Sequence, residues 1–203
     1  MHQILIPPDS TADETAFAPI LDCLRGDGVI AAPTETVFGL MALWKSEPAR
    51  KRIYALKGRD FGKPLQMLAP NLATAIRYGI RPNKRVRQIA ARFWPGPLTA
   101  VLPATTQKSI GLRVPDHPFI LRLLQLLGEP LAATSANLSG SSPATSPDEI
   151  PGLLRDDPDL LVTGQNAEGG QASTVVALLD HDRRILRQGP IAAAELKPYL
   201  TAP

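Results

Sequence analysis

Two short segments of the chain place hydroxyl and basic side chains around a flexible glycine. Segment 33–39 (PTETVFG) holds Thr34, Glu35 and Thr36, and segment 57–60 (KGRD) holds Lys57 and Arg59. Lysine and arginine beside a glycine can approach a phosphate closely, and arginine can bind it with a fork of N–H donors. Taken alone, the first segment also fits a surface turn, and the second fits basic residues capping the end of a helix.

Three further polar segments lie at predicted strand ends or corners. Segment 93–99 (FWPGPLT) predicts a rigid proline corner that supports the wall of a cleft, and segment 134–140 (TSANLSG) offers Ser135 and Asn137 as donors. Ser173 and Arg187 lie on the two arms of a predicted hairpin. Such donors after a strand can cradle a phosphate or carboxylate, although a plain polar loop explains segment 134–140 equally well.

Other common chemical motifs are missing from the sequence. It has no Walker A sequence, no GxGxxG, no CxxC and no GxSxG. The histidines His2, His117 and His181 are scattered, so we expect no metal held by protein ligands. Cys23 lies in an apolar helical stretch and is predicted to be a core residue.

Charge is distributed unevenly along the chain. The net charge is +3, from 22 Lys and Arg against 19 Asp and Glu, yet no acidic residue occurs from Phe61 to Pro115. Such a one-signed stretch suggests an anionic partner such as nucleotide phosphate or RNA, while for Arg77 to Arg92 a solvated basic helix face is an equal alternative. The basic residues of the stretch are Lys63, Arg77, Arg81, Lys84, Arg85, Arg87, Arg92, Lys108 and Arg113.

Length and composition indicate an ordinary globular chain. Its 203 residues predict one domain, 1–203, and 44% hydrophobic with 20% charged residues argues against disorder. No apolar run is long enough to span a membrane, and the N-terminus lacks the pattern of a secretory signal. A single cysteine fits a reducing compartment, so we expect a cytoplasmic protein with no membrane partner.

Helical and strand patterns alternate along the chain. Ser46 and Asn71 are predicted to cap two helices, and Ser146 begins a capping box. The alternation ends in a hairpin and predicts an α/β fold with a twisted mixed sheet flanked by helices. Strands are expected at 3–6, 29–32, 65–69, 98–102, 112–114, 131–134, 160–162, 174–179 and 184–187, and helices at 13–25, 48–56, 72–78, 83–93, 118–127 and 192–200.

Taken in order, seven motifs resemble the Sua5/YrdC family: PTETVFGL, KGRD…KPL, FWPGPLT, LRVPDHP, ATSANLSG, STVV and ILRQG. They run from residue 33 to residue 189, and the chain length is similar to that of the single-domain members. The resemblance implies a YrdC-like fold around a large open basic groove. It also implies a nucleotidyltransferase, L-threonylcarbamoyladenylate synthase, which makes threonylcarbamoyl-AMP and pyrophosphate from L-threonine, bicarbonate and ATP.

The resemblance also implies partners and residue roles. In the family, the threonylcarbamoyl group passes to adenosine 37 of tRNA, so tRNA is an expected partner, directly or through a threonylcarbamoyltransferase complex. Mg²⁺ is expected to arrive with ATP. Lys57 and Arg59 are the implied catalytic residues. The implied ATP-binding residues are Lys57, Arg59, Lys63, Ser109, Ser135, Asn137, Pro143 and Arg187, and the implied threonine-binding residues are Thr34, Thr36, Arg113 and Ser173.

The chain departs from the family pattern in places. Phe38 replaces a common tyrosine and Leu68 a histidine found in some relatives, so we expect a more apolar threonine pocket. Asp60, Ala177 and Gln188 also differ from the usual residues.

Two other function classes stay open. One is an RNA-binding module without catalysis, although aromatic residues make up only 5% and no RRM or KH signature occurs. The other is a hydrolase or carbamoyltransferase-type enzyme acting on another substrate, since the family fold also occurs within larger carbamoyl-transfer proteins.

Overall fold

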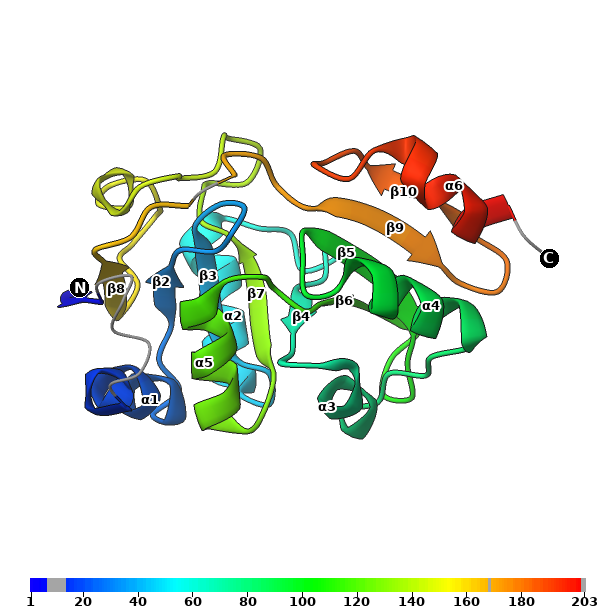
Figure 1. Cartoon of the computed structure of the whole chain (residues 1–203). Helices are drawn as coiled ribbons and strands as arrows, with labels where there is room; N and C mark the ends of the chain where they lie inside the picture. The colour runs from blue at the N-terminus through cyan, green and yellow to red at the C-terminus, as the bar shows by residue number, and fades with distance from the viewer. Residues whose placement is uncertain (7–13, 168, 202–203) are drawn as a thin grey trace.

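A ten-stranded mixed sheet runs through the molecule in the order β1-β8-β2-β3-β7-β4-β6-β5-β9-β10 (Figure 1). The computed structural model describes residues 1–6, 14–167 and 169–201. Its mixed sheet and flanking helices confirm the predicted α/β class. The strands are β1 (His2–Leu5), β2 (Ile30–Ala32), β3 (Gly39–Leu43), β4 (Gln66–Leu68), β5 (Leu98–Pro103), β6 (Ser109–Arg113), β7 (Leu131–Ser135), β8 (Leu160–Thr163), β9 (Thr174–Leu178) and β10 (Arg183–Arg187).

The helices are short, the longest being α2 with 11 residues. No helix in the described part of the chain is long and apolar enough to cross a membrane. The predicted helix 13–25 begins at an undescribed residue, and its described part is a 3₁₀ turn, η2 (Glu14–Phe17), followed by α1. The helices are α1 (Ala18–Arg25), α2 (Glu47–Lys57), α3 (Leu72–Arg77), α4 (Lys84–Phe93), α5 (Pro118–Leu127) and α6 (Ala193–Thr201), with a second 3₁₀ turn, η3 (Pro147–Glu149).

Local capping signals are confirmed. The Ser46 side chain accepts a hydrogen bond from the Ala49 backbone at the start of α2, and Asn71 does the same for Thr74 at the start of α3. The capping box at Ser146 is present, but it begins only the short turn η3. Helix α2 ends at Gly58, whose φ of +56° favours glycine, so Lys57 and Arg59 lie on either side of the helix end.

Strand β3 was not predicted from the sequence. Its residues, GLMAL, show no alternation and include glycine and alanine, which favour strands weakly. All five are buried, because β3 pairs antiparallel with β2 on one side and β7 on the other. The central position of β3 comes from these nonlocal pairings, and the local pattern could not reveal it.

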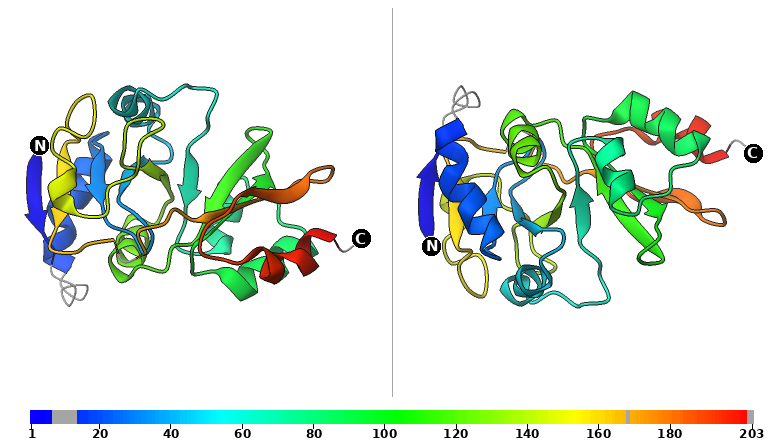
Figure 2. Two further views of the ribbon diagram at one scale, coloured as in Figure 1. Left: turned by 90° about the horizontal axis from the view of Figure 1, so that it is seen from above. Right: turned by 90° about the horizontal axis from the view of Figure 1, so that it is seen from below.

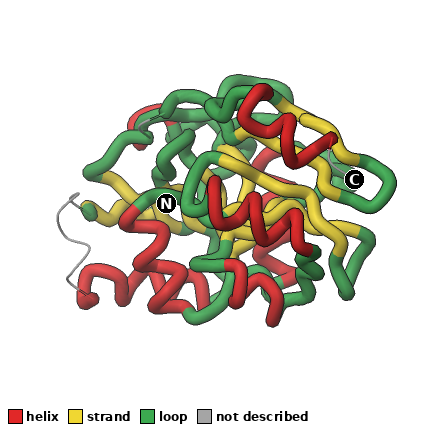
Figure 3. The backbone as a smooth tube through the Cα atoms, turned by 45° about the vertical axis from the view of Figure 1, so that its right-hand side comes forward, coloured by secondary structure: helices red, strands yellow, loops and turns green. Residues whose placement is uncertain are grey.

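Helices cover both faces of one half of the sheet. Alternate residues of β2 and β3 face two separate cores: Met41 packs with α1 and α5, while Leu40 packs with α2. In the other half, α3, α4 and α6 pack in a single core with β5, β6 and β9. Figure 2 shows β1 and α6 toward opposite ends of the molecule, and in Figure 3 loops cross the upper side of the view.

The strands of the second half have one apolar and one polar face. On β5, Ala100 and Leu102 enter the core beside α4, while Thr99 and Val101 face the other way into a cavity. On β6, Leu112 enters the core and Arg113 faces the cavity. The predicted strand at 112–114 therefore covers only the end of β6. Two earlier residues of β6, Ser109 and Gly111, also line the cavity.

Cys23 was predicted to be a core residue, but it is only partly buried and packs against the edge of the core around α1. Burial first, and the negative charge of Asp159 second, raise the pKa of its thiol to about 11. The thiol is therefore uncharged at neutral pH.

Gly189, which follows the β9–β10 hairpin, has no space for a side chain. A Cβ there would lie 2.3 Å from the Thr174 backbone nitrogen and 2.5 Å from the Ala172 oxygen, atoms that cannot move aside independently. We expect Gly189→Ala to lower the free energy of unfolding by about 2 kcal/mol in urea denaturation. Gly62→Ala is the control, since its nearest neighbour is an Asp60 carboxylate oxygen at 3.4 Å. Equal stability of the two variants would contradict the prediction.

Candidate functional site

A cavity of about 260 Å³ lies over the polar face of β5, β6 and β9. Residues from β4, β7 and β10, from the loop before β3, and from the segments before β4 and β9 complete its lining. Among the described residues that line it, there is no aspartate or glutamate. Its polar lining residues are Thr36, Arg59, Gln66, Thr99, Ser109, Arg113, Thr134, Ser135, Ser173 and Arg187.

The cavity brings together residues that lie far apart in the sequence. Of the predicted site residues, it gathers Thr36, Arg59, Ser109, Arg113, Ser135, Ser173 and Arg187. It also contains Gln66 and Thr99, which the sequence analysis did not select. Thr99 lies within the FWPGPLT motif, which was interpreted as structural, and Gln66 carried no signal beyond its place after KPL.

The loop before β3 is closed by Thr34. Its hydroxyl oxygen accepts from the backbone nitrogens of Thr36 and Val37, at 3.1 and 3.3 Å, and donates to the Val37 carbonyl at 2.7 Å. Thr34 is buried and does not line the cavity, whereas Thr36 does. Thr34 therefore shapes the loop that presents Thr36.

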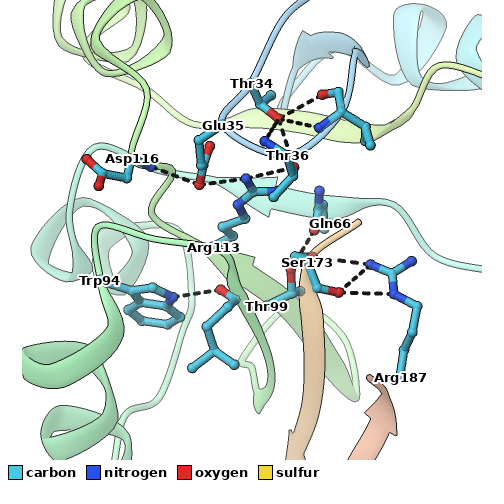
Figure 4. Close-up of polar contacts among 12 residues, drawn as sticks. Thr34, Glu35, Thr36, Gln66, Trp94, Thr99, Arg113, Asp116, Ser173 and Arg187 are labelled. Atoms are coloured by element: carbon cyan, nitrogen blue, oxygen red, sulfur yellow. Dashed lines mark hydrogen bonds and ion pairs between the residues drawn. The ribbon is translucent and has the colours of Figure 1, made fainter. Parts of the chain in front are cut away.

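Arg113 is 3% exposed and is held on one side only. Its Nη2 atom lies 2.6 Å from Glu35 Oε1 and donates to Thr36 Oγ1 at 3.0 Å (Figure 4). The same Glu35 oxygen accepts from the Asp116 backbone nitrogen at 2.9 Å. Among the described residues, Arg113 Nη1 has no hydrogen-bond partner. The Nη2 atom is thus held by Glu35 and Thr36, and the Nη1 atom is available to a ligand.

Arg187 reaches back from β10 to the start of β9. Its Nε and Nη2 atoms donate to the Ser173 carbonyl at 3.1 and 2.8 Å, and Nη2 also lies 3.2 Å from Ser173 Oγ. Burial first, and the positive charge of Arg113 second, lower the pKa of Arg187. Two cations therefore face one cavity, and a bound anion would relieve their repulsion.

Lys57 lies behind the cavity wall rather than in it. The side chain is 2% exposed, and its Nζ atom donates to the Ser135 carbonyl, to the Asn137 carbonyl at 2.8 Å and to Asn137 Oδ1 at 2.9 Å. Burial first, and Arg59 second, lower its pKa to about 8, so the amine stays protonated at neutral pH. Lys57 therefore ties the end of α2 to the loop that carries Ser135.

Several other expected site residues lie outside the cavity lining. The Asn137 amide nitrogen is used by the Leu138 and Ser141 carbonyls, at 2.8 and 2.7 Å. Lys63 is exposed, and its carbonyl accepts from Arg59 Nε at 2.9 Å. Pro143 is partly buried beside the same loop as Asn137.

The expected effect of Phe38 and Leu68 on the cavity is wrong. Both side chains are buried in cores, Phe38 with α2 and Leu68 with α1 and α5, and neither lines the cavity. Their apolar character contributes to packing and does not make the cavity more apolar.

The acid-free stretch supplies strands β4, β5 and β6 to this cavity, but little of its positive charge. Of its basic residues only Arg113 lines it, while Arg77 lines a second, wider hollow of about 940 Å³ together with Lys45 and Arg50. The large open basic groove stays a prediction. Within the described ranges, no group of three or more His, Cys, Asp or Glu side chains is placed to hold a metal ion.

Comparison with known proteins identifies relatives along most of the chain. A family model named Sua5/YciO/YrdC, described as telomere recombination, matches residues 22–189. The chain is 39% identical over 152 residues to a threonylcarbamoyl-AMP synthase of Serratia proteamaculans, covering 70% of this chain and 80% of the relative. It is 31% identical to the Bacillus subtilis protein of the same name, covering 96% of this chain and 59% of that one.

A solved structure shows the same fold. Sua5 of Pyrococcus abyssi complexed with L-threonine superposes with a TM-score of 0.90 at 28% identity, over 99% of this chain and 61% of that one. The chain thus spans about 60% of the Bacillus and Pyrococcus proteins, and a larger share of the Serratia protein.

Removing the Lys57 amine tests its supporting role. In Lys57→Met, the buried oxygens of Ser135 and Asn137 lose their donor, and we expect the free energy of unfolding to fall by roughly 3 kcal/mol in urea denaturation. Lys51→Met, on the exposed side of the same helix, is the control and should leave stability nearly unchanged. A Lys57 variant as stable as the control would show that the amine does not support this loop.

The lowered pKa of Lys57 also predicts a pH dependence. Between about pH 8 and the ordinary value of 10.5, the unfolded chain holds a proton that folded Lys57 has lost. Deprotonation therefore adds to the stability that the Lys57 hydrogen bonds provide at pH 7; this added part is complete above pH 10.5 and is lost as pH falls through 8. We expect the stability difference between wild type and Lys57→Met to grow from pH 7 to pH 10, by at most ~3 kcal/mol. A difference independent of pH would contradict this.

Proposed function

Because the chain belongs to the Sua5/YciO/YrdC family, we propose that it is an L-threonylcarbamoyladenylate synthase. It combines L-threonine, bicarbonate and ATP and releases threonylcarbamoyl-AMP and pyrophosphate, which makes it a nucleotidyltransferase. The names of relatives at 39% and 31% identity support the activity, and the threonine complex of the Pyrococcus structure supports the amino acid.

The observation that carries the proposal is the cavity, in which Arg59, Arg113 and Arg187 gather with no acid in the described lining. Arg113 keeps Nη1 unpaired and lies beside Thr36, which suits a carboxylate. Arg59 and Arg187 are positioned to offset the charge that builds on phosphate oxygens. Ser109 and Ser135 add hydroxyl groups to the same lining.

The proposed chemistry needs no covalent enzyme intermediate. The neutral amine of threonine attacks the carbon of bicarbonate, water leaves, and N-carboxythreonine forms. A carbamate oxygen then attacks the α-phosphorus of ATP, the bond to the β-phosphate breaks, and pyrophosphate leaves. The chain contributes positioning and electrostatic stabilisation, with Lys57 acting through the Ser135 loop rather than by direct contact.

The volume of the cavity limits what it encloses. About 260 Å³ lies just below the usual range of ligand pockets, roughly 300–1,000 Å³. We assign it to the amino acid and the reacting phosphate, with the nucleoside extending past the rim. No described lining residue offers a carboxylate to Mg²⁺, so we assign no residue to this ion and expect phosphate oxygens and water to hold it.

We further propose that the product serves tRNA modification. The mixed anhydride is an activated acyl group, which a partner threonylcarbamoyltransferase passes to adenosine 37 of tRNA. Whether tRNA contacts this chain or only the partner complex is decided by the RNA-binding measurement below.

Pyrophosphate release with ATP, bicarbonate and a series of amino acids tests the activity, with mass spectrometry identifying the adenylate. We expect threonine to give the fastest release. Arg59→Met should lower kcat/KM about 100-fold, because it removes a donor to the phosphates. Arg25→Met, on the exposed face of α1, is the charge-matched control and should retain the wild-type rate.

Two results would favour the other function classes. Salt-sensitive RNA binding without threonine-dependent pyrophosphate release would indicate an RNA-binding module. Turnover of carbamoyl phosphate without adenylate formation would indicate a carbamoyltransferase-type enzyme. A near-wild-type rate in Arg59→Met would remove this residue from the proposed phosphate contacts.

A further inference from the structure

A chain of hydrogen bonds crosses the floor of the cavity from Arg187 to Gln66. Arg187 Nη2 lies 3.2 Å from Ser173 Oγ, Ser173 Oγ lies 2.9 Å from Thr99 Oγ1, and Thr99 Oγ1 donates to Gln66 Oε1 at 2.9 Å (Figure 4). These side chains come from β10, the start of β9, β5 and β4. The chain therefore links four strands of the sheet.

The two ends of this chain give it one direction. A guanidinium only donates hydrogen bonds, so Ser173 Oγ accepts from Arg187. Thr99 gives its single hydroxyl proton to the amide oxygen of Gln66, so Thr99 accepts the Ser173 proton. With its oxygen bonded to Thr99, the Gln66 amide has its nitrogen on the other side.

In this orientation the amide nitrogen of Gln66 makes no contact that stabilises the fold. Among the described residues, its two N–H groups have no hydrogen-bond partner. Figure 4 shows this nitrogen pointing toward Thr36 and Arg113, which line the same cavity. Arg113 Nη1 is also unpaired there, so two unused donors lie at the same end of the cavity.

We propose that Gln66 is a substrate-binding residue that binds the carboxylate of the amino-acid substrate together with Arg113. The Gln66 amide donates to the carboxylate, and Arg113 Nη1 donates alongside it. This assignment rests on the proposed function, because it takes the substrate to be an amino acid. An amide suits the position, since it adds donors without a third positive charge beside Arg113 and Arg187.

Gln66→Glu separates this role from a purely structural one. A glutamate can still accept the hydrogen bond from Thr99, so the chain across the floor is kept. It loses the amide donors, however, and turns a negative charge toward Arg113 and the substrate carboxylate. A structural residue would tolerate this change, whereas a carboxylate-binding residue would not.

The measurement is the dissociation constant for L-threonine by calorimetry, without ATP. We expect Gln66→Glu to weaken binding at least about 10-fold, because a hydrogen bond to a charged group is lost. Gln125→Glu makes the same chemical change on the exposed side of α5 and should bind threonine as wild type does. ATP binding, measured separately, should be unchanged in Gln125→Glu.

A second ligand identifies the group that Gln66 contacts. L-Threoninamide keeps the ammonium and the hydroxyl but lacks the carboxylate. We expect wild type to prefer threonine over threoninamide, and Gln66→Glu to reduce this preference at least about 10-fold. Equal losses for both ligands, unchanged threonine binding in Gln66→Glu, or no threonine binding by wild type would each overturn the assignment.

The same data distinguish this assignment from the proposed function. A wild-type protein that binds threonine through Gln66 but forms no adenylate would reject the synthase activity alone. A wild-type protein that forms the adenylate, with a Gln66→Glu variant of unchanged threonine affinity, would reject only the role of Gln66.

Discussion

Among the residues that the structure describes, the cations Lys57 and Arg113 are buried almost completely, and both need oxygen acceptors. Lys57 is 2% exposed and Arg113 is 3% exposed. A buried charge without partners is costly, so the chain must bring carbonyl, hydroxyl or carboxylate oxygens to each. The acceptors come from the end of β7 and the loop after it, Ser135 and Asn137, for Lys57, and from the loop before β3, Glu35 with Thr36, for Arg113. Burying these cations therefore determines where the loops around the cavity lie.

The direction of two series of hydrogen bonds explains why the cavity offers donors. One series runs from Arg113 to Thr36, then to Thr34 and on to the Val37 carbonyl. The other runs from Arg187 and ends on Gln66. Each ends on an oxygen that only accepts, and each hydroxyl has a single proton, so every hydroxyl proton along the series points away from the arginine. The donors left unpaired face the cavity, which suits it to anionic oxygens.

Local signals were enough for the helices and insufficient for much of the site. Helix α5 begins and ends at the predicted residues 118 and 127, because proline at its start and glycine after its end act locally. Strand β3 depends on pairing with β2 and β7, and Gln66 meets Thr99 only through a contact across 33 positions. The sequence predicts a phosphate contact for Lys57. No local pattern could show that its amine donates to oxygens of Ser135 and Asn137.

Strands β5, β6 and β9 each have one face that packs in the core and one face that lines the cavity. Ala100, Leu112 and Val176 face the core, while Thr99, Arg113 and Val175 face the cavity. Substitutions of Thr99 and Val175 leave the packing of the first set intact. During divergence, a lineage carrying this sheet can therefore exchange its ligand contacts one residue at a time while inheriting the same framework. In this architecture, substrate preference can change faster than the fold changes.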